Sequence, residues 1–148
     1  MTPEPPSIQV IGPPAGEVVN ILGAPVVIKS GVDAQGLFFA DHPVPPGYFV
    51  PMHVHQDEDE LFYVLEGELS LQSPARALTA GPGSYVHLPR GAPHGFGNAG
   101  AAPVRMLVVS TAGGLEGVFR GLHAAAHNGP PGPDQVGEIC AGNGVRLL

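Results

Sequence analysis

Three histidines and one glutamate stand at spacings that suit a metal site. His53 and His55 are two residues apart, and side chains alternate between faces along a β-strand, so both imidazoles would point to the same side. Glu60 follows five residues later, and His94 comes directly after the turn-forming stretch Pro89–Pro93. Imidazole together with carboxylate suits a divalent transition metal (Fe, Mn, Ni, Co, Cu or Zn) better than Mg or Ca. We therefore expect these four side chains to bind one such ion.

The same residues belong to two longer patterns that resemble the motifs of the cupin superfamily. The first, G(X)5HXH(X)3-4E(X)6G, is matched with every spacing kept at Gly47, His53, His55, Glu60 and Gly67. The second, G(X)5PXG(X)2H(X)3N, is matched in the same way at Gly83, Pro89, Gly91, His94 and Asn98. The resemblance implies an all-β fold, the cupin barrel (double-stranded β-helix or jelly roll). It also implies a metal inside that barrel on the three histidines and the glutamate.

The expected chemistry follows from the ligand count. Four protein ligands on a metal that prefers six leave open positions for a small molecule. Three neutral imidazoles and one carboxylate leave an M²⁺ site with a net charge of about +1, which favours small anionic chelators: enolates, α-hydroxy ketones, dicarboxylates and catechol-like oxygens. The chain resembles single-domain cupins of the quercetin dioxygenase type, which implies an oxidoreductase, a dioxygenase, with Glu60 as candidate general base. Two alternatives stay open: a non-oxidative isomerase, decarboxylase or lyase on a keto-acid, and a non-catalytic cupin that binds a small ligand.

Three further acidic residues compete with Glu60 for the metal. Asp57, Glu58 and Asp59 directly precede it, but the motif spacing favours Glu60. We expect the other three to form a solvated acidic loop. His87 is interpreted as an ordinary strand histidine rather than as a donor to the ligand set.

Alternation along the strands also predicts which aromatic side chains approach the metal. With both imidazoles of the first motif inward, Phe49 would be inward too. The same argument from the other two ligands sends Phe62 and Phe96 inward. We expect these three rings to line a substrate pocket, with plain core packing as the alternative. His42, in a turn-rich segment, is assigned no role.

Short apolar runs separated by turns predict the remaining strands. The chain has 22 glycines and 18 prolines, dispersed between these runs as in a barrel or sandwich. Besides the segments that carry the ligands, the predicted strands are Ser7–Ile11, Glu17–Leu22, Pro25–Ser30, Leu37–Ala40, Ser84–Leu88 and Val104–Ser110.

The last part of the chain changes character. Leu115, Val118, Phe119 and Leu122 recur at helical spacing, which predicts an amphipathic helix over 113–126. A segment rich in proline and glycine interrupts it, and a second short helix is expected over 134–140. We therefore divide the chain into a barrel, residues 1–112, and a helical C-terminal tail, residues 113–148, that packs on the barrel as a lid or pocket wall.

Composition restricts the partners. The formal net charge is −7 with only six Lys and Arg, so no basic cluster is available for nucleic acid or an anionic membrane surface. A lone cysteine excludes an internal disulfide. Because no secretory pattern and no apolar run of ~20 residues is visible, we expect a cytoplasmic protein. The expected partners are a small-molecule substrate, O2 in the oxidative reaction, and a second copy in a homodimer, with an N-terminal strand available for exchange.

Overall fold

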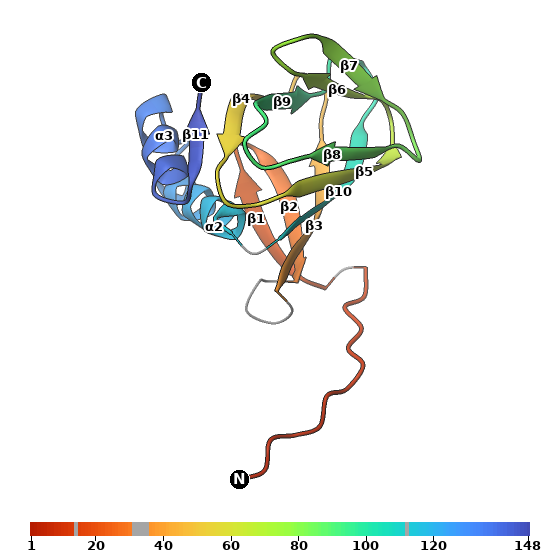
Figure 1. The fold of residues 1–148 in the computed structure, drawn as a ribbon, viewed down its shortest axis with the longest axis vertical. Coiled ribbons are helices and arrows are strands. Elements are labelled where there is room, and N and C mark those ends of the chain that lie inside the picture. Colours follow the sequence, from red (N-terminus) through yellow and green to blue (C-terminus); the bar gives the residue numbers. More distant parts are fainter. Residues whose placement is uncertain (14, 31–35, 112) are drawn as a thin grey trace.

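The computed structural model describes residues 1–13, 15–30, 36–111 and 113–148, and within them two antiparallel sheets face each other (Figure 1). The first sheet contains, in spatial order, β1 (Glu17–Ile21), β2 (Ala24–Ser30), β3 (Leu37–Val44), β10 (Val104–Thr111), β5 (Glu60–Glu66) and β8 (Tyr85–Leu88). The second contains β11 (Val145–Leu147), β4 (Phe49–His55), β9 (His94–Gly97), β6 (Leu69–Gln72) and β7 (Ala77–Ala80). The predicted all-β barrel with short C-terminal helices is confirmed.

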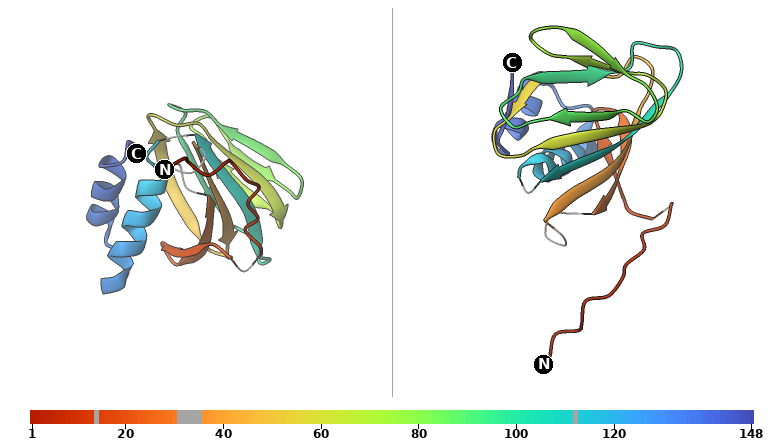
Figure 2. Two further views of the ribbon diagram at one scale, coloured as in Figure 1. Left: turned by 90° about the horizontal axis from the view of Figure 1, so that it is seen from below. Right: turned by 45° about the vertical axis from the view of Figure 1, so that its right-hand side comes forward.

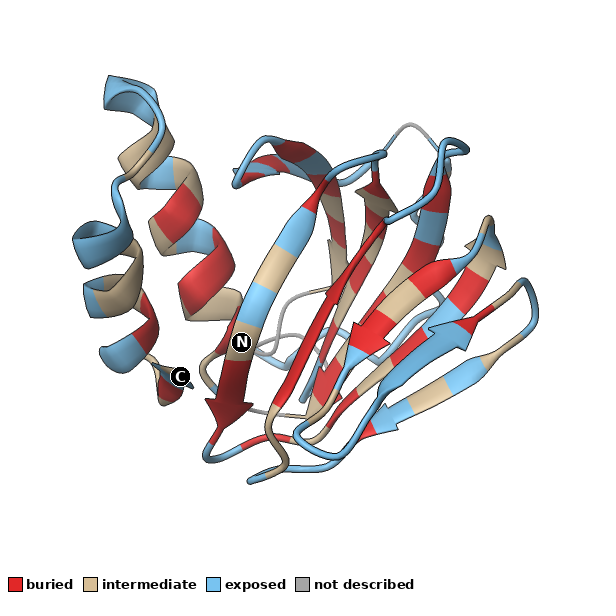
Figure 3. Cartoon of the chain, turned by 90° about the horizontal axis from the view of Figure 1, so that it is seen from above, coloured by how far each residue is buried: buried red, intermediate tan, exposed pale blue. Residues whose placement is uncertain are grey.

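The core lies between the two sheets. Buried and exposed residues alternate along most strands (Figure 3), as the period of two requires. The most deeply buried large side chains include Phe38, Phe62 and Met106, which come from three adjacent strands of the first sheet. β3 extends beyond the predicted Leu37–Ala40 because its antiparallel pairing with β10 continues as far as Val44.

The N-terminal residues 1–12 form an extended arm that leaves the barrel (Figures 1 and 2). The predicted strand Ser7–Ile11 is wrong for this chain, since no strand forms there. Ile8 and Val10 are 95% and 85% exposed, so the apolar residues that suggested a strand have no cover in the described part of the chain. The homodimer and the exchanged strand stay predictions.

The tail comprises α2 (Leu115–Ala125), the 3₁₀ turn η1 (Ala126–Asn128), α3 (Pro133–Ala141) and β11. Both predicted helices are present, and they lie next to each other on one side of the barrel (Figure 2). All four apolar residues of the predicted stripe of α2 are buried. β11 pairs with β4, an arrangement that no local pattern in the sequence indicated. Among the described helices, none has the length and apolar character needed to cross a membrane.

Candidate metal centre

β4 places two histidines in the barrel through an irregularity in its pairing with β9. The register shifts between Val50 and His53, which breaks strict alternation at that point. His53 and His55 are buried, whereas Phe49 is 51% exposed and Pro51 is exposed as well. The prediction that Phe49 faces inward is therefore wrong, because the bulge changes the face on which the first half of the strand lies.

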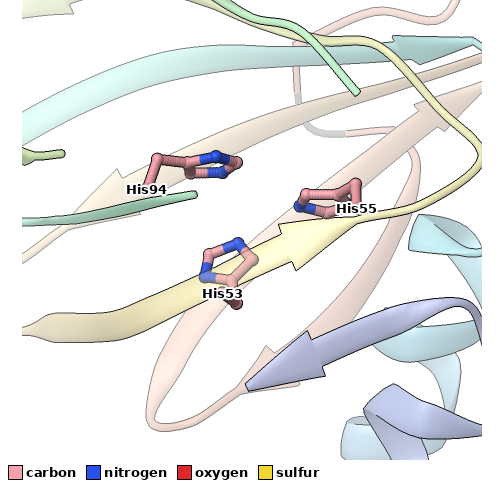
Figure 4. Close-up of side chains that lie close together, drawn as sticks. All are labelled: His53, His55 and His94. Atoms are coloured by element: carbon pink, nitrogen blue, oxygen red, sulfur yellow. The ribbon is translucent and has the colours of Figure 1, made fainter. Parts of the chain in front are cut away.

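The three imidazoles come together inside the barrel. His53 lies opposite His94 in the β4–β9 pair, and His55 follows on the same strand (Figure 4). One nitrogen of each ring lies within 4.8 Å of the others, and all three side chains are buried. The rings of His55 and His94 stack with an interplanar angle of 8°. The three predicted histidines can therefore hold one metal ion.

Backbone carbonyls orient two of these rings. The Nδ1 atom of His53 is 2.8 Å from the carbonyl oxygen of Pro51, and that of His94 is 3.0 Å from the carbonyl oxygen of Ala92. A carbonyl oxygen only accepts, so Nδ1 carries the proton in both rings. The Nε2 lone pairs are thus left for a metal, the arrangement in which ligating histidines are usually held.

Glu58 orients the third ring, and it does not belong to a solvated loop. Its Oε1 accepts a hydrogen bond from Nδ1 of His55 at 2.6 Å, and its Oε2 accepts one from the backbone N–H of Leu115 at 3.2 Å. The residue is 1% exposed, whereas Asp57 is exposed and Asp59 pairs with Arg90 at the surface. The expectation of a solvated acidic loop is therefore wrong for Glu58, because the tail packs over it.

Glu60 begins β5 and is 4% exposed. Its Oε1 lies 3.4 Å from Nε2 of His94 and 3.7 Å from Nε2 of His55. These three atoms are buried and have no hydrogen-bond partner among the described residues. Buried polar atoms are normally hydrogen-bonded. Two imidazole nitrogens and one carboxylate oxygen that face one another without such partners therefore fit a divalent cation, which would accept their lone pairs.

Burial and proximity set the protonation of the cluster. Burial lowers the pKa of His53 to about 4, and the neighbouring His94 adds to the effect, so His53 is neutral at pH 7. For Glu60, burial opposes ionisation, but the surrounding imidazoles outweigh it and lower the carboxyl pKa. For His55, burial is outweighed by the bond to Glu58 and by both nearby carboxylates, so its pKa is raised. At His55, therefore, a metal competes with a more tightly held proton.

A cavity of about 70 Å³ lies beside His53 and His55, between the barrel and the tail. The other described residues that line it are aliphatic or proline, except for Cys140, and none is charged. α2 contributes Val118 and Leu122, and β11 contributes two more aliphatic side chains. The tail is thus one wall of an apolar pocket that touches two of the candidate ligands.

None of the three phenylalanines assigned to the pocket lines this cavity. Phe62 and Phe96 are buried and pack edge to face, with ring centroids 5.1 Å apart. His42 packs against Phe96 in the same aromatic cluster, 1% exposed, and burial lowers its pKa to about 4. Alternation from Phe38 and Ala40 would have placed His42 inside, but the surrounding prolines suggested a turn.

Comparison with known proteins agrees with this architecture. Residues 42–110 match the Cupin_2 family, described as a cupin domain, and this segment contains all four candidate ligands. The fold is a cupin fold. The cupin domain is also similar to the polyketide cyclase RemF from Streptomyces resistomycificus, at 25% identity and a TM-score of 0.62, over 71% of this chain and 80% of that one.

Two further similarities support the cupin superfamily. A sugar phosphate isomerase from Silicibacter pomeroyi aligns at 28% identity and a TM-score of 0.55, over 62% of this chain and 61% of that one. The rice (Oryza sativa subsp. japonica) protein Germin-like protein 1-1 is 32% identical over 130 residues, which cover 83% of this chain. The chain spans 58% of the length of this relative.

Proposed function

We propose that this cupin is a metal-dependent enzyme, a dioxygenase of a small and largely apolar organic molecule. His53, His55, Glu60 and His94 are the proposed ligands of one divalent transition metal. The observation that carries the proposal is the cavity beside His53 and His55, whose lining combines two metal-ligand imidazoles with aliphatic side chains and no charge among the described residues.

The lining of the cavity selects among substrate classes. A phosphate or dicarboxylate needs several cationic or hydrogen-bonding partners when it leaves water, and beyond His53, His55 and Cys140 the described lining is aliphatic or proline. An apolar ring or chain with one or two oxygen donors would place its body against Val118 and Leu122 and its oxygen at the metal. Enols, catechol-like molecules and β-diketones have this character.

The residues of the chain would divide the work. A divalent metal on these ligands supplies Lewis-acid polarisation of a substrate oxygen and, if it is redox-active, a centre for chemistry with O2. Glu60, ionised at neutral pH and buried at the cluster, can accept the proton that an enol or catechol loses on binding. The aliphatic walls keep water away from the anion thus formed.

Non-oxidative chemistry is the second candidate, and the similarity to a protein named as a polyketide cyclase favours it. The same ligands and the same base would serve an isomerisation, a cyclisation or a C–C cleavage without O2. The similarity to a sugar phosphate isomerase carries less weight for the substrate, because the cavity lacks a cationic side chain among its described lining residues.

Metal analysis combined with oxygen uptake tests the proposal. Freshly purified protein is analysed for metals, reloaded with each of the six candidate ions, and screened with flavonols, catechols and β-diketones in an oxygen electrode and under anaerobic conditions. We expect one metal per chain and O2 consumption that Glu60→Gln abolishes. Turnover that persists without O2 would establish the second candidate. A protein that binds none of the six ions would refute both.

A further inference from the structure

The carboxylate of Glu58 makes two contacts that belong to different parts of the molecule. One oxygen holds Nδ1 of His55, a candidate metal ligand, and the other holds the backbone N–H of Leu115, the first residue of α2. Leu115 lies 57 positions after Glu58 along the chain. A single buried side chain therefore joins the metal site to the start of the tail.

The contact with Leu115 replaces a missing local cap. Gly114 occupies the N-cap position of α2 and has no side chain to bind the free N–H groups of the first turn. Glu58 supplies an acceptor from another segment, and its negative charge lies at the positive end of the helix. Release of this carboxylate would leave the beginning of α2 buried without its partner.

The fit around Glu58 is close. A Cβ atom added to Gly113 would lie 1.9 Å from Oε2 of Glu58, so only glycine allows the chain to approach the carboxylate there. A Cβ at Gly114 would meet the carbonyl oxygen of Asn143 at 1.6 Å, in the turn that leads to β11. The start of α2 thus packs closely against both the carboxylate of Glu58 and the turn before β11.

We propose that Glu58 is a positioning residue that couples metal binding at His55 to docking of the tail over the apolar pocket. His55 and Leu115 both depend on the carboxylate of Glu58 as their hydrogen-bond acceptor. The bond to Nδ1 fixes the tautomer that leaves Nε2 of His55 free for the metal, and the bond to Leu115 N–H holds the pocket wall closed. The inference rests on the proposed metal site.

The link has a thermodynamic consequence. If metal binding at His55 multiplies the equilibrium constant for docking of the tail by a given factor, docking of the tail multiplies the metal association constant by the same factor. The cavity of about 70 Å³ is small beside the roughly 300–1,000 Å³ of pockets for drug-sized ligands, and the tail forms one of its walls, so movement of the tail would enlarge it. Opening the tail for substrate would then loosen the orientation of one metal ligand.

Glu58→Gln is the informative substitution. The amide keeps the shape of the side chain but has one acceptor oxygen, whereas Nδ1–H of His55 and N–H of Leu115 each require an acceptor. The variant must leave one N–H unpaired or turn its NH2 group toward His55, which then takes the tautomer that blocks Nε2. Glu68→Gln, at an exposed position, is the matched control.

The test measures Zn²⁺ affinity by chelator competition, the His55 tautomer by long-range ¹H–¹⁵N NMR of the metal-free protein, and amide exchange in α2 with and without Zn²⁺. We expect Glu58→Gln to weaken Zn²⁺ binding by about 10–100-fold. We also expect it to shift the His55 tautomer and to speed exchange at Leu115. In the unmodified protein, Zn²⁺ should slow exchange in α2, and in the variant this slowing should be lost.

Gly113→Ala provides a second route, since it displaces the carboxylate without altering it, and Gly132→Ala is its control because no atom lies within 4 Å of the added Cβ. The coupling would be overturned if Glu58→Gln bound Zn²⁺ with unchanged affinity. It would also be overturned if Zn²⁺ did not change the rate of amide exchange in α2 of the unmodified protein. Neither result would exclude the metal site itself. Failure of the unmodified protein to bind any of the six candidate ions would instead remove the proposed function.

Discussion

Val145 lies directly opposite His55 in the antiparallel β11–β4 ladder, so the C-terminal strand covers the edge of the strand that carries two candidate ligands. The contact continues at both ends, where Gln56 N–H donates to the carbonyl of Gly144 and Leu148 N–H donates to that of Met52. Without β11, β4 would present unpaired N–H and C=O groups at a sheet edge. The tail therefore completes the sheet beside the candidate metal centre, and it also forms one wall of the adjacent pocket.

Removal of one imidazole should abolish metal binding without unfolding the barrel. His94→Ala deletes one of the buried nitrogens that face the shared centre, and we expect metal content to fall from one ion per chain to a trace while the strand signal in circular dichroism persists. His87→Ala, at an exposed position on β8, should keep its metal. Full metal content in His94→Ala would exclude this histidine as a ligand.

Cys140 reports on the closure of the pocket. It is the single cysteine, it is 5% exposed in the cavity lining, and burial raises the pKa of its thiol. We expect iodoacetamide to label it at least about 10-fold more slowly than the unfolded chain, since labelling requires the tail to open. An exposed thiol introduced by Val18→Cys in a Cys140→Ala background gives the rate without protection. Equal rates at the two positions would show that the tail is not docked.

Acid should destabilise the fold through His42. Burial lowers its pKa to about 4 from 6.5, so between these values the unfolded chain binds more protons than the folded one. Stability contributed by neutral His42 is therefore complete above pH 6.5 and is lost as the pH falls toward 4, with a slope of up to about 1.4 kcal/mol per pH unit. Urea titrations across this range should show a shallower slope for His42→Gln. His87→Gln is the exposed control, and an unchanged slope for His42→Gln would contradict the assignment.

Two motif glycines should differ in what a methyl group costs. Gly67 and Gly83 both have positive φ, but a Cβ at Gly67 would lie 2.3 Å from the carbonyl oxygen of Pro103, whereas no atom lies within 4 Å of one at Gly83. Gly83→Ala should cost about 1–2 kcal/mol of unfolding free energy, the cost of a left-handed residue. Gly67→Ala should cost more, because the backbone must also move. Equal losses in urea unfolding would show that the clash at Gly67 relaxes freely.

Local sequence was enough to predict the strands and helices in which apolar residues recur with a regular period. Alternating apolar runs predicted most of the strands, and the stripe from Leu115 to Leu122 predicted α2, because the pattern of burial repeats at the period of the backbone. The two motifs indicated that His53, His55 and His94 belong together, and the structure brings them within reach of one ion. These features depend on spacing along the chain, which a sequence contains in full.

Only the tertiary structure decided the features that depend on segments distant in the chain. The bulge that turns Phe49 outward arises in the pairing of β4 with β9, and the burial of Glu58 arises when the tail packs over its loop. The residues adjacent to Phe49 do not indicate a bulge, and those adjacent to Glu58 do not distinguish it from the acidic residues Asp57 and Asp59. A carboxylate is as polar in a loop as beneath a helix, and its environment is set by whichever segment docks on it, here one that begins at Leu115.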